Sequence, residues 1–541
     1  MNILGIQLGH LSSVTLYKEG KLVYYNQEER LSKIKKDNSI PIMCFQQLKN
    51  YVSHIDIAFI TGYNPCEISS QIYSLLKKFN VCDKEFGTYF LFKSHHLMHA
   101  AKAYFSSGFK DALIFVVDGR GSSYNLSDGS IGYETESVYT LDYPNDFNAI
   151  FKKVYTRQEE IKNLKVNPDF ESPLAYKIKN VSITKDTIFK VSNQHVLGQF
   201  YSAISKTIGF DNEEGKLMGL SAYGKSNPAI KHYLNQKNII NPNNLILKNH
   251  NLIPLKEDLS YETQLKFEKE YLNFMKPFVK KYSKYKNIIL TGGTGLNILN
   301  NRKVKDYFKN HNVYVDPMCG DEGNSIATCQ HYLYANKKDS SFDKVNSLYL
   351  GPSYSLDKNV KFKNSDEKKV VDLLLRKNIV ALYQDKAEAG PRALGNRSLL
   401  MDPRIPNGKF IMNELKGREQ FRPLACCVLE EYAKHWFDLD YSPYMMYSAY
   451  AINKTKEKVY SIVHEDNSCR IQTINKKQNP ILYKILKLFY NKTKVPILMN
   501  TSFNLKGQPI VETPTDAINT IKKSKLKYLY FSKEKKLYED N

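Results

Sequence analysis

The chain has 541 residues, which is too long for one small core and predicts at least two domains. Its hydrophobic content of 42% and charged content of 25% are typical of a globular protein, and no apolar run is long enough to predict a membrane span. The 78 Lys and Arg against 55 Asp and Glu give a net charge of +23, which favours anionic partners such as nucleotides, phosphorylated substrates or nucleic acid. An AT-rich coding bias toward Lys, Asn, Ile and Tyr is the alternative explanation.

The cysteines and the N-terminus predict a cytoplasmic location. Apart from the adjacent Cys426 and Cys427, the eight cysteines are scattered, and none forms a zinc-type Cys-x-x-Cys pair. The first five residues lack the basic and apolar pattern of a signal peptide. We therefore expect reduced thiols.

The chain opens with strands predicted at residues 2–7, 13–17 and 22–25, the last two joined by a hairpin turn. The glycine-containing loop between the first two strands carries His10, a candidate general base because histidine titrates near neutrality. A surface histidine is the alternative. The charged run at 28–37 is typical of a solvated face.

A histidine cluster follows at the head of a predicted helix. His95 and His99 are four residues apart, so they project from one face and could reach one metal ion. Asp118 ends an apolar strand at 112–117 and is placed to add a third ligand. The alternative is that the histidines cap the helix and bond to the backbone. The strand pattern from residue 112 repeats the opening, which predicts duplicated lobes around a cleft.

Glycine-rich stretches come next, after a poorly periodic segment at 151–195 that we interpret as an insertion. Residues 213–225 contain glycines and two lysines, which indicates either close backbone approach to a ligand or ordinary turns. Gly292 and Gly293 follow a short strand and could offer N–H groups to a phosphate, although no Walker or dinucleotide motif is present. Asp321, at another strand-to-helix junction, is the leading candidate for a fourth metal ligand, with an N-cap aspartate as the alternative.

The ordered set of motifs resembles the NodU/CmcH-type O-carbamoyltransferases from about residue 3 to residue 517. The N-terminal motifs are His95-His96-x-x-His99, Val117-Asp118-Gly119, Gly219–Gly224, Gly292-Gly293 and Gly320–Gly323. The most recognisable segment is Glu388–Ser398, followed by Asp402-Pro403-Arg404. The pairing of Lys416-x-Arg418 with the distant Ser502-x-Asn504 is similar to a YrdC-type adenylate-forming domain.

This resemblance implies an α/β protein with two domains. Residues 1–356 would form an actin-like ATPase (TsaD-like) domain with duplicated α/β lobes and a metal site. Residues 370–541 would form a YrdC-like α/β domain, joined through a polar linker at 357–369. A homodimer is the default expectation for the assembly.

The resemblance also implies a two-step reaction. The C-terminal domain would form carbamoyladenylate and pyrophosphate from carbamoyl phosphate and ATP, with Mg²⁺ accompanying the ATP. The N-terminal domain would then transfer the carbamoyl group to a hydroxyl, with Fe(II) or another divalent metal as Lewis acid. The candidate catalytic residues for this reaction are His10, Lys416 and Arg422.

The implied ligands fall into three sets. The metal would be held by His95, His99, Asp118 and Asp321, with His96 behind them. The adenylate would contact Lys216, Gly219, Gly292, Gly293 and Asn297. Carbamoyl phosphate and ATP would contact a dense set of cations, suited to phosphate oxygens, and two neutral groups: Arg392, Arg397, Lys416, Arg418, Arg422, Arg470, Ser502 and Asn504.

The acceptor stays open at this point. It could be a hydroxylated metabolite such as a sugar or natural product, or a hydroxymethylated pyrimidine in a nucleotide or DNA, which the basic charge favours. Threonylcarbamoyl transfer to tRNA ranks lower, because residues 388–397 look like the carbamoyl-phosphate branch. A non-catalytic nucleotide-binding scaffold is opposed by the complete set of proposed ligands.

Overall fold

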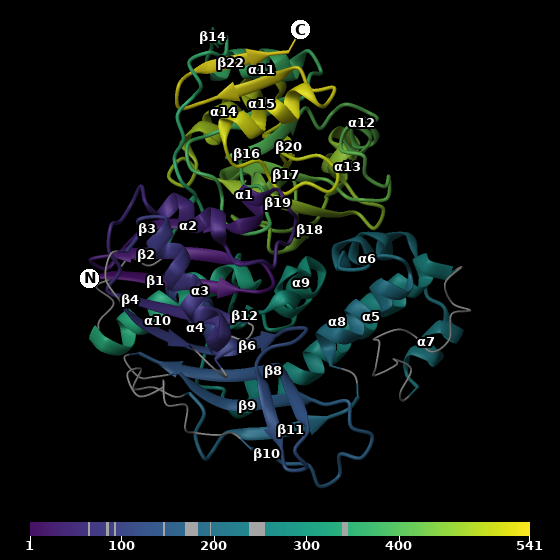
Figure 1. Cartoon of the computed structure of the whole chain (residues 1–541). Coiled ribbons are helices and arrows are strands. Elements are labelled where there is room, and N and C mark those ends of the chain that lie inside the picture. Colours follow the sequence, from purple (N-terminus) through teal and green to yellow (C-terminus); the bar gives the residue numbers. More distant parts are fainter. Residues whose placement is uncertain are drawn as a thin grey trace. The chain divides into compact units, whose positions relative to one another are not determined.

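The structure, a computed structural model, describes residues 1–540 except 63–64, 83–85, 91–93, 144–146, 168–181, 195, 237–254 and 338–344. The described chain has a mixed α/β fold with several sheets, and it divides into two compact units (Figure 1). Unit 1 comprises Met1–Glu28 and Asp37–Asn346, and unit 2 comprises Glu29–Lys36 and Ser347–Asn541. No described helix is long and apolar enough to cross a membrane.

These units differ in extent from the predicted domains. The change from unit 1 to unit 2 comes after Asn346, earlier than the predicted end at 356. The predicted linker at 357–369 contains a short strand, β14 (Lys363–Asn364), and the beginning of helix α11 (Glu367–Leu375). The prediction of a solvated face at 28–37 is confirmed only at residues 33–35, which are exposed, and is wrong for Arg30, whose side chain is only 2% exposed.

The first sheet of unit 1 has the strand order β3-β2-β1-β4-β5. β1, β4 and β5 are parallel, whereas β2 and β3 are antiparallel to their neighbours. The predicted hairpin is confirmed: Glu19 and Gly20 have positive φ values of 53° and 78°, as a two-residue turn between right-twisted strands requires. The strands are β1 (Asn2–Leu8), β2 (Ser13–Lys18), β3 (Lys21–Gln27), β4 (Ile57–Gly62) and β5 (Gly87–Phe90).

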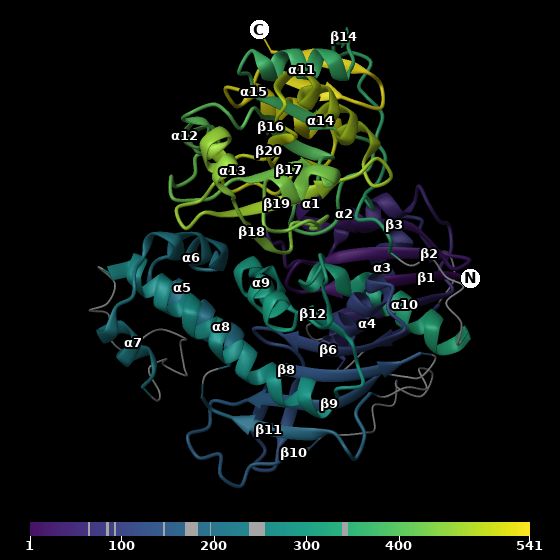
Figure 2. The same cartoon turned by 180° about the vertical axis from the view of Figure 1, so that it is seen from behind.

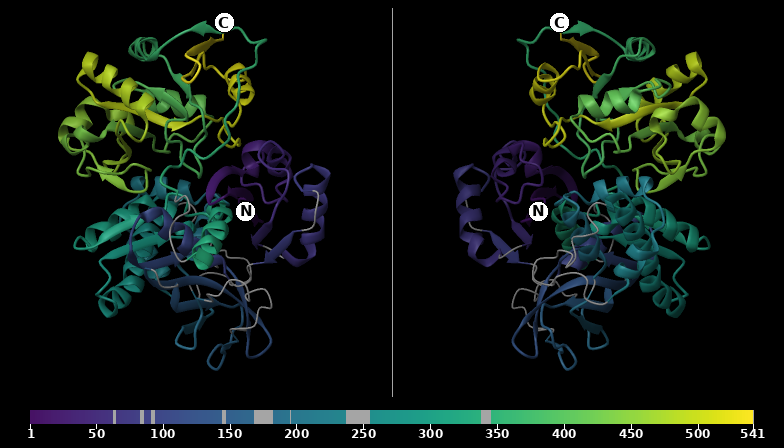
Figure 3. Two further views of the ribbon diagram at one scale, coloured as in Figure 1. Left: turned by 90° about the vertical axis from the view of Figure 1, so that its left-hand side faces the viewer. Right: turned by 90° about the vertical axis from the view of Figure 1, so that its right-hand side faces the viewer.

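The second sheet of unit 1 repeats this topology in the order β9-β8-β6-β12-β13. Here β6, β12 and β13 are parallel, β8 is antiparallel to β6, and β9 is antiparallel to β8. β7 and β10 extend the sheet beside β8, and β11 pairs in parallel with β9. Figure 3 shows the purple first sheet and the blue part of the second as separate layers. The strands are β6 (Asp111–Val117), β7 (Ser123–Leu126), β8 (Ile131–Asp142), β9 (Asn148–Tyr155), β10 (Val166–Asn167), β11 (Ile188–Ser192), β12 (Asn287–Thr291) and β13 (Asn312–Val315).

Helices α4 (His95–Ser107) and α10 (Asn324–Lys337) lie between the two sheets. α10 packs on β1, β2 and β4, and α4 packs on α10, β6 and β12. Gly5 of β1 allows this packing, because a Cβ there would lie 2.0 Å from the carbonyl oxygen of Ser325. Figure 2 shows the long helix α8 (Lys256–Lys281) running toward the second sheet. Its Phe274 and Phe278 contact Phe115 of β6. β6 is therefore buried along its length, which explains its continuous apolar sequence.

The remaining helices of unit 1 are shorter than α8. They are α2 (Ile42–Leu48), α3 (Pro65–Lys78), α5 (Leu197–Thr207), α6 (Glu214–Leu220), α7 (Pro228–Leu234) and α9 (Ile298–Tyr307). α2 and α3 pack on strands of the first sheet, and α5, α6, α7 and α9 pack on α8. The five-residue helix α1 (Glu28–Ser32) spans the point where the chain leaves unit 1.

Unit 2 is built on a nine-stranded mixed sheet in the order β14-β22-β21-β15-β16-β20-β17-β19-β18. α11 packs on α14 and β15, and α14 also packs on β17 and β20. The other strands are β15 (Val380–Tyr383), β16 (Arg397–Met401), β17 (Ala425–Leu429), β18 (Ser448–Tyr450), β19 (Ser468–Ile474), β20 (Ile497–Ser502), β21 (Tyr528–Phe531) and β22 (Lys536–Glu539). The other helices are α12 (Gly408–Leu415), α13 (Asn453–Lys458), α14 (Pro480–Thr493) and α15 (Pro514–Lys522).

Candidate metal centre and cation cluster

The four predicted metal ligands come from three places in unit 1. His95 and His99 lie in the first two turns of α4 and project from one side of it. Asp118 directly follows β6, at the edge of the sheet where the carboxyl ends of three parallel strands meet. Asp321 begins the 3-10 helix η5 (Asp321–Gly323), which leads into α10.

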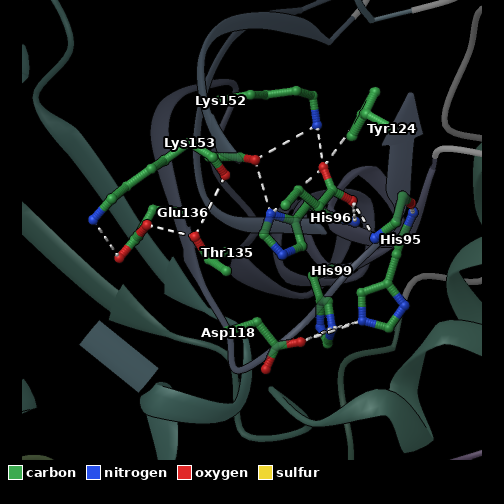
Figure 4. A network of polar contacts seen from close by, with 12 residues as sticks. His95, His96, His99, Asp118, Tyr124, Thr135, Glu136, Lys152 and Lys153 are labelled. Atoms are coloured by element: carbon green, nitrogen blue, oxygen red, sulfur yellow. Dashed lines mark hydrogen bonds and ion pairs between the residues drawn. The ribbon is translucent and has the colours of Figure 1, made fainter. Parts of the chain in front are cut away.

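The structure brings these four side chains together. His95 Nε2 lies 3.3 Å from Asp118 Oδ2 and 3.3 Å from Asp321 Oδ1. His99 Nε2 lies 3.2 Å from His95 Nε2, 3.3 Å from Asp321 Oδ1 and 3.8 Å from Asp118 Oδ2. All four ligand atoms lie within 4.8 Å of one another, and Figure 4 shows His95 and His99 pointing toward Asp118. Tetrahedral ligands at about 2.1 Å from an ion are about 3.4 Å apart, so the group fits one ion.

The charges of the group also suit a divalent ion. Burial would raise the pKa of Asp118, but the hydrogen bond with His95 and the nearby His99 lower it to about 2. The same two histidines outweigh burial at Asp321 and lower its pKa as well. Burial would lower the pKa of His95, yet Asp321 and Asp118 raise it well above its usual value. Two ionised carboxylates and two imidazoles form a donor set that Fe(II) or Zn(II) accepts.

The first turn of α4 is held by side chains from other elements. Its N-cap residue, Ser94, makes no side-chain capping bond. Instead, the backbone N–H of His95 donates to Ser122 Oγ at 3.1 Å, and that of His96 donates to Glu134 Oε1 at 3.2 Å. Glu134 Oε1 also accepts the backbone N–H of Ser122 at 3.1 Å. A carboxylate at a helix N-terminus is favourable, so Glu134 orients the turn that carries His95.

A buried lysine neutralises Glu134. Lys152 Nζ donates to Glu134 Oε2 at 2.6 Å and to the Tyr139 hydroxyl at 2.9 Å, and both charged side chains are 0% exposed (Figure 4). His96 faces this network, away from the metal ligands: its Nδ1 lies 2.8 Å from Ser137 Oγ, and burial lowers its pKa to about 3. Sequence reasoning missed this pair, because nothing in the sequence separates Glu134 from Glu136 or Lys152 from Lys153 in their strands.

Replacing Lys152 by methionine is expected to lower the free energy of unfolding by about 3–5 kcal/mol, because it leaves the Glu134 charge buried without its partner. Guanidinium unfolding followed by circular dichroism measures the loss. The matched control combines Lys152→Met with Glu134→Gln, which removes both charges and should recover most of the stability. Equal stability of the single and double variants would contradict this account.

Asp321 is positioned from the first sheet. The carbonyl oxygen of Glu322, the next residue, accepts hydrogen bonds from the hydroxyls of Ser13 at 3.0 Å and Tyr25 at 3.1 Å. Ser13 also donates to Ser325 Oγ at 2.8 Å, at the beginning of α10. The first sheet of unit 1 thus fixes one carboxylate of the cluster, and the second sheet fixes the other.

Gly292 and Gly293 lie beside the metal ligands. Gly292 has a φ of 86°, and a Cβ there would lie 2.5 Å from the Val117 carbonyl oxygen, so only glycine fits this close approach. The Gly293 N–H donates to Asp118 Oδ1 at 3.0 Å. This N–H therefore supports a metal ligand, and its contact with a phosphate stays a prediction.

The other predicted residues of unit 1 are spread over its elements. Asn297 caps α9 by accepting the backbone N–H of the third residue of that helix. Lys216, on α6, forms an ion pair with Glu213, and Gly219 is buried in the same helix. His10 is exposed in the turn between β1 and β2. The roles predicted for these four residues, at the adenylate and as general base, stay predictions.

In unit 2, the predicted pairing of Lys416 with Ser502 and Asn504 exists in space. Lys416 follows α12, is 1% exposed, and directs its Nζ at the end of β20. Nζ donates to the Asn504 carbonyl oxygen and Oδ1, both at 2.9 Å, and to the carbonyl oxygen and hydroxyl of Ser502. Arg418 Nη2 lies 3.5 Å from Ser502 Oγ.

Two arginines act on Lys416, and three act on Arg470. Burial, together with Arg418, Arg422 and Lys35, lowers the pKa of Lys416 well below its usual value. Burial likewise lowers the pKa of Arg470, with contributions from Arg392, Arg422 and Arg418. We call Arg392, Lys416, Arg418, Arg422 and Arg470 the cation cluster. Cations that repel one another in a partly buried place form a site that a polyanion stabilises.

Arg397, predicted to bind phosphate with the others, has a different role. Its side chain is 0% exposed and stacks on Tyr383, with the guanidinium carbon 3.5 Å from the ring centroid. Its N–H groups donate to the backbone carbonyls of Asn396 at 3.0 Å, Asp385 at 3.1 Å and Glu512 at 3.1 Å, as well as Gln384. Because main-chain carbonyl oxygens accept these N–H groups, the Arg397 guanidinium stabilises the fold. The prediction that Arg397 binds phosphate is therefore wrong.

Two family models match most of the chain. The model described as carbamoyltransferase N-terminus matches residues 67–276 and 247–329, and the model described as carbamoyltransferase C-terminus matches residues 371–535. An uncharacterized protein of Methanocaldococcus jannaschii is 30% identical over 78% of this chain and 70% of its own length. Nodulation protein U of Rhizobium tropici is 31% identical over 41% of this chain and 39% of its own length.

Among solved structures, full-length HypF in its phosphate- and nucleotide-bound form covers 63% of this chain and 47% of its own, with 14% identity and a TM-score of 0.38. A similarity this low does not define a shared arrangement. The two family models and the relatives in sequence do define the lineage: the chain belongs to the NodU-type carbamoyltransferase family.

Proposed function

We propose that the protein is an ATP-dependent O-carbamoyltransferase that uses carbamoyl phosphate as donor and a hydroxyl group as acceptor. The observation that carries the donor half is the contact of Lys416 with Ser502 and Asn504 among four arginines in unit 2. The observation that supports the transfer half is the convergence of His95, His99, Asp118 and Asp321 in unit 1.

The donor half joins two anions, so its main requirement is positive charge. Carbamoyl phosphate loses its phosphate to water, and an oxygen of the resulting carbamate attacks the α-phosphorus of ATP and expels pyrophosphate. The products are carbamoyladenylate, pyrophosphate and phosphate. Arg418, Arg422 and Arg470 would hold phosphate oxygens with their planar guanidinium groups, and Lys416 would stabilise the charge that builds up during attack.

The transfer half makes a carbamate ester from an alcohol. The acceptor oxygen attacks the carbamoyl carbon, the bond to AMP breaks, and the hydroxyl proton passes to a base. His10 is exposed in the turn that follows β1, where its imidazole is open to an acceptor, which supports it as that base. A divalent metal on His95, His99, Asp118 and Asp321 would supply Lewis acidity at the carbonyl oxygen.

The repeated strand topology of unit 1 supports an actin-like, TsaD-like domain with duplicated lobes, and we assign the YrdC-like role to unit 2. The acceptor is proposed to be a hydroxylated small molecule. A nucleotide or DNA acceptor with a hydroxymethylated pyrimidine is supported by the net charge of +23.

The test supplies ¹⁴C-carbamoyl phosphate, ATP, Mg²⁺ and Fe(II) to purified protein together with candidate acceptors. Pyrophosphate should form when both donors are present and should not form when either is omitted. Mass spectrometry should find one carbamoyl unit added to the true acceptor. Protein that releases no pyrophosphate with both donors would contradict the proposal.

The affinity of unit 2 for ATP is expected to fall with rising pH. Burial and the neighbouring cations hold the pKa of Lys416 well below its usual value, so the site loses a positive charge as the pH rises through that lowered pKa. Calorimetric titration from about pH 7, where phosphate groups with a pKa near 6 are mostly ionised, to about pH 10 measures this effect. Lys416→Met should bind more weakly and lose the pH dependence. A wild-type affinity that does not change up to about pH 10 would contradict the assignment.

A further inference from the structure

Helix α4 carries a buried lysine in line with its two metal-binding histidines. His95, His99 and Lys102 are spaced by four and three residues, so they project from one side of the helix. The Lys102 side chain is 1% exposed. Its Nζ donates to Asp316 Oδ1 at 3.1 Å and to Ser106 Oγ, on α4 itself, at 2.9 Å. A buried ammonium is costly unless it is paired, so the contact with Asp316 fixes the place of this lysine.

Asp316 begins the segment that leads to the fourth metal ligand, Asp321. It directly follows β13, and its side chain is 0% exposed. Asp316 Oδ1, which accepts from Lys102, also accepts the backbone N–H of Met318 at 3.2 Å. One carboxylate oxygen therefore ties the turn after β13 to helix α4. We call residues 316–321 the ligand segment.

The aliphatic part of Lys102 packs closely against the same region. A Cβ at Gly323, in η5, would lie 2.7 Å from the Met318 carbonyl oxygen and 3.3 Å from Lys102 Cγ. α4 also packs on η5 as a whole. Because closely packed interiors transmit small displacements, a shift of the lysine would be felt along the ligand segment.

The ligand segment thus meets one side of α4 at both of its ends. At its far end, Asp321 Oδ1 lies 3.3 Å from His95 Nε2 and 3.3 Å from His99 Nε2. At its near end, Asp316 pairs with Lys102, which lies about one turn beyond His99. Two like-charged carboxylates would otherwise be free to move apart from the helix, and the ion pair holds the near one.

We propose that Lys102 and Asp316 are positioning residues of the metal centre. Their ion pair sets the separation between the two imidazoles of α4 and the Asp321 carboxylate, and with it the affinity of the site for a divalent ion. Groups that orient metal ligands commonly contribute about 10- to 100-fold to metal affinity. This inference rests on the proposed function, in which a divalent metal is bound by these ligands.

The experiment measures the affinity of the full chain for Co(II) by competition with a chelator. Co(II) accepts the same ligands as Fe(II) and Zn(II), and its visible absorption reports their number and arrangement. Guanidinium unfolding of the metal-free protein is measured beside it. Lys102→Met leaves the Asp316 charge buried without its partner, so it should lower the unfolding midpoint and weaken Co(II) binding by about tenfold or more.

The decisive variant combines Lys102→Met with Asp316→Asn. It removes both buried charges, and asparagine keeps an oxygen that can accept the Met318 N–H, so the unfolding midpoint should largely return. The tie between α4 and the ligand segment stays broken. Co(II) binding should therefore remain about tenfold or more weaker than in the wild type, with a changed absorption spectrum.

The control for destabilisation alone is Leu76→Ala. Leu76 is 0% exposed in α3, which packs on α2, β4 and β5, so its truncation should lower the unfolding midpoint through a cavity. Its Co(II) affinity should stay within about threefold of the wild type. A fall in affinity as large as that of Lys102→Met would overturn the inference, because metal binding would then follow stability and not the ion pair.

The remaining outcomes separate this inference from the proposed function. Wild-type Co(II) affinity in the double variant would overturn the positioning role and leave the metal centre, and the function proposed for it, intact. A wild-type protein that binds neither Co(II), Fe(II) nor Zn(II) would remove the metal centre from the proposed function, and the positioning role would be overturned with it.

Discussion

Asp118→Asn is expected to lower carbamoyl transfer at least about 100-fold while pyrophosphate formation continues. Asp118 Oδ2 lies 3.3 Å from His95 Nε2 and 3.8 Å from His99 Nε2, so the substitution removes the negative charge that balances both imidazoles and the proposed metal ion. Asparagine keeps the shape of the side chain and can still accept the Gly293 N–H through its amide oxygen. The rate of product formation measures carbamoyl transfer, and the metal content of the purified protein measures whether the proposed ion is still bound.

The matched control for this variant is Asp128→Asn. Asp128 is an exposed carboxylate in unit 1 that accepts hydrogen bonds from Ser130, so its loss changes the net charge equally but should leave transfer and metal content unchanged. An Asp118→Asn protein with normal metal content and near-normal transfer would remove the metal centre from the proposal. A protein that loses pyrophosphate formation as well would show that the two half-reactions are not separated as proposed.

Arg422→Ala is expected to give the opposite pattern: pyrophosphate formation falls by about 100- to 1000-fold, and metal content stays normal. Arg422 is 26% exposed and forms one ion pair, with Glu419 at 3.6 Å, so its removal should not unfold unit 2. Its guanidinium acts on both Lys416 and Arg470, which places it among the cations of the cluster. Exchange of labelled pyrophosphate into ATP measures the loss.

Arg404→Ala is the control for Arg422→Ala. Arg404 also lies in unit 2, is 37% exposed, and pairs with Asp402 at 2.6 Å, but it does not act on Lys416 or Arg470. The Arg404→Ala variant should therefore exchange pyrophosphate into ATP at the wild-type rate. If both arginine variants exchange pyrophosphate at the wild-type rate, the cation cluster does not activate the donor.

Local patterns predicted the strands well, because each strand depends on few residues, and they selected four side chains that the structure brings together. The apolar run at 112–117 is confirmed as β6 apart from one residue, and Asp118 follows it as expected. The helix predicted with the histidines at its head is confirmed as α4, and Ser122 and Glu134 from distant positions satisfy its first N–H groups. The convergence of Asp321 depends on two sheets packing around α4 and α10, which no local pattern contains.

Side-chain roles in unit 2 show a different limit. Arg397 and Arg422 are both arginines in or near glycine- and proline-containing loops, and the sequence offers no distinction between them. The difference is tertiary: backbone carbonyls satisfy the Arg397 guanidinium, whereas Arg422 is partly exposed beside Lys416 and Arg470. The burial of Arg30 within the charged run at 28–37 escapes prediction for the same reason. Nothing near it in the sequence indicates that its guanidinium donates to the Gly390 carbonyl oxygen.

Because Glu29–Lys36 belongs to unit 2, the gene cannot be divided by a single cut into parts that encode the two units. One cut between the coding regions for Met1–Asn346 and Ser347–Asn541 would deprive the downstream polypeptide of the Arg30 guanidinium, which donates hydrogen bonds to the Gly390 and Glu388 carbonyls. A chimera that exchanges only the downstream half with a relative would combine an octapeptide from one parent with a binding surface from the other. When unit 2 is expressed as a fragment or exchanged with that of a relative, residues Glu29–Lys36 must therefore be kept together with Ser347–Asn541.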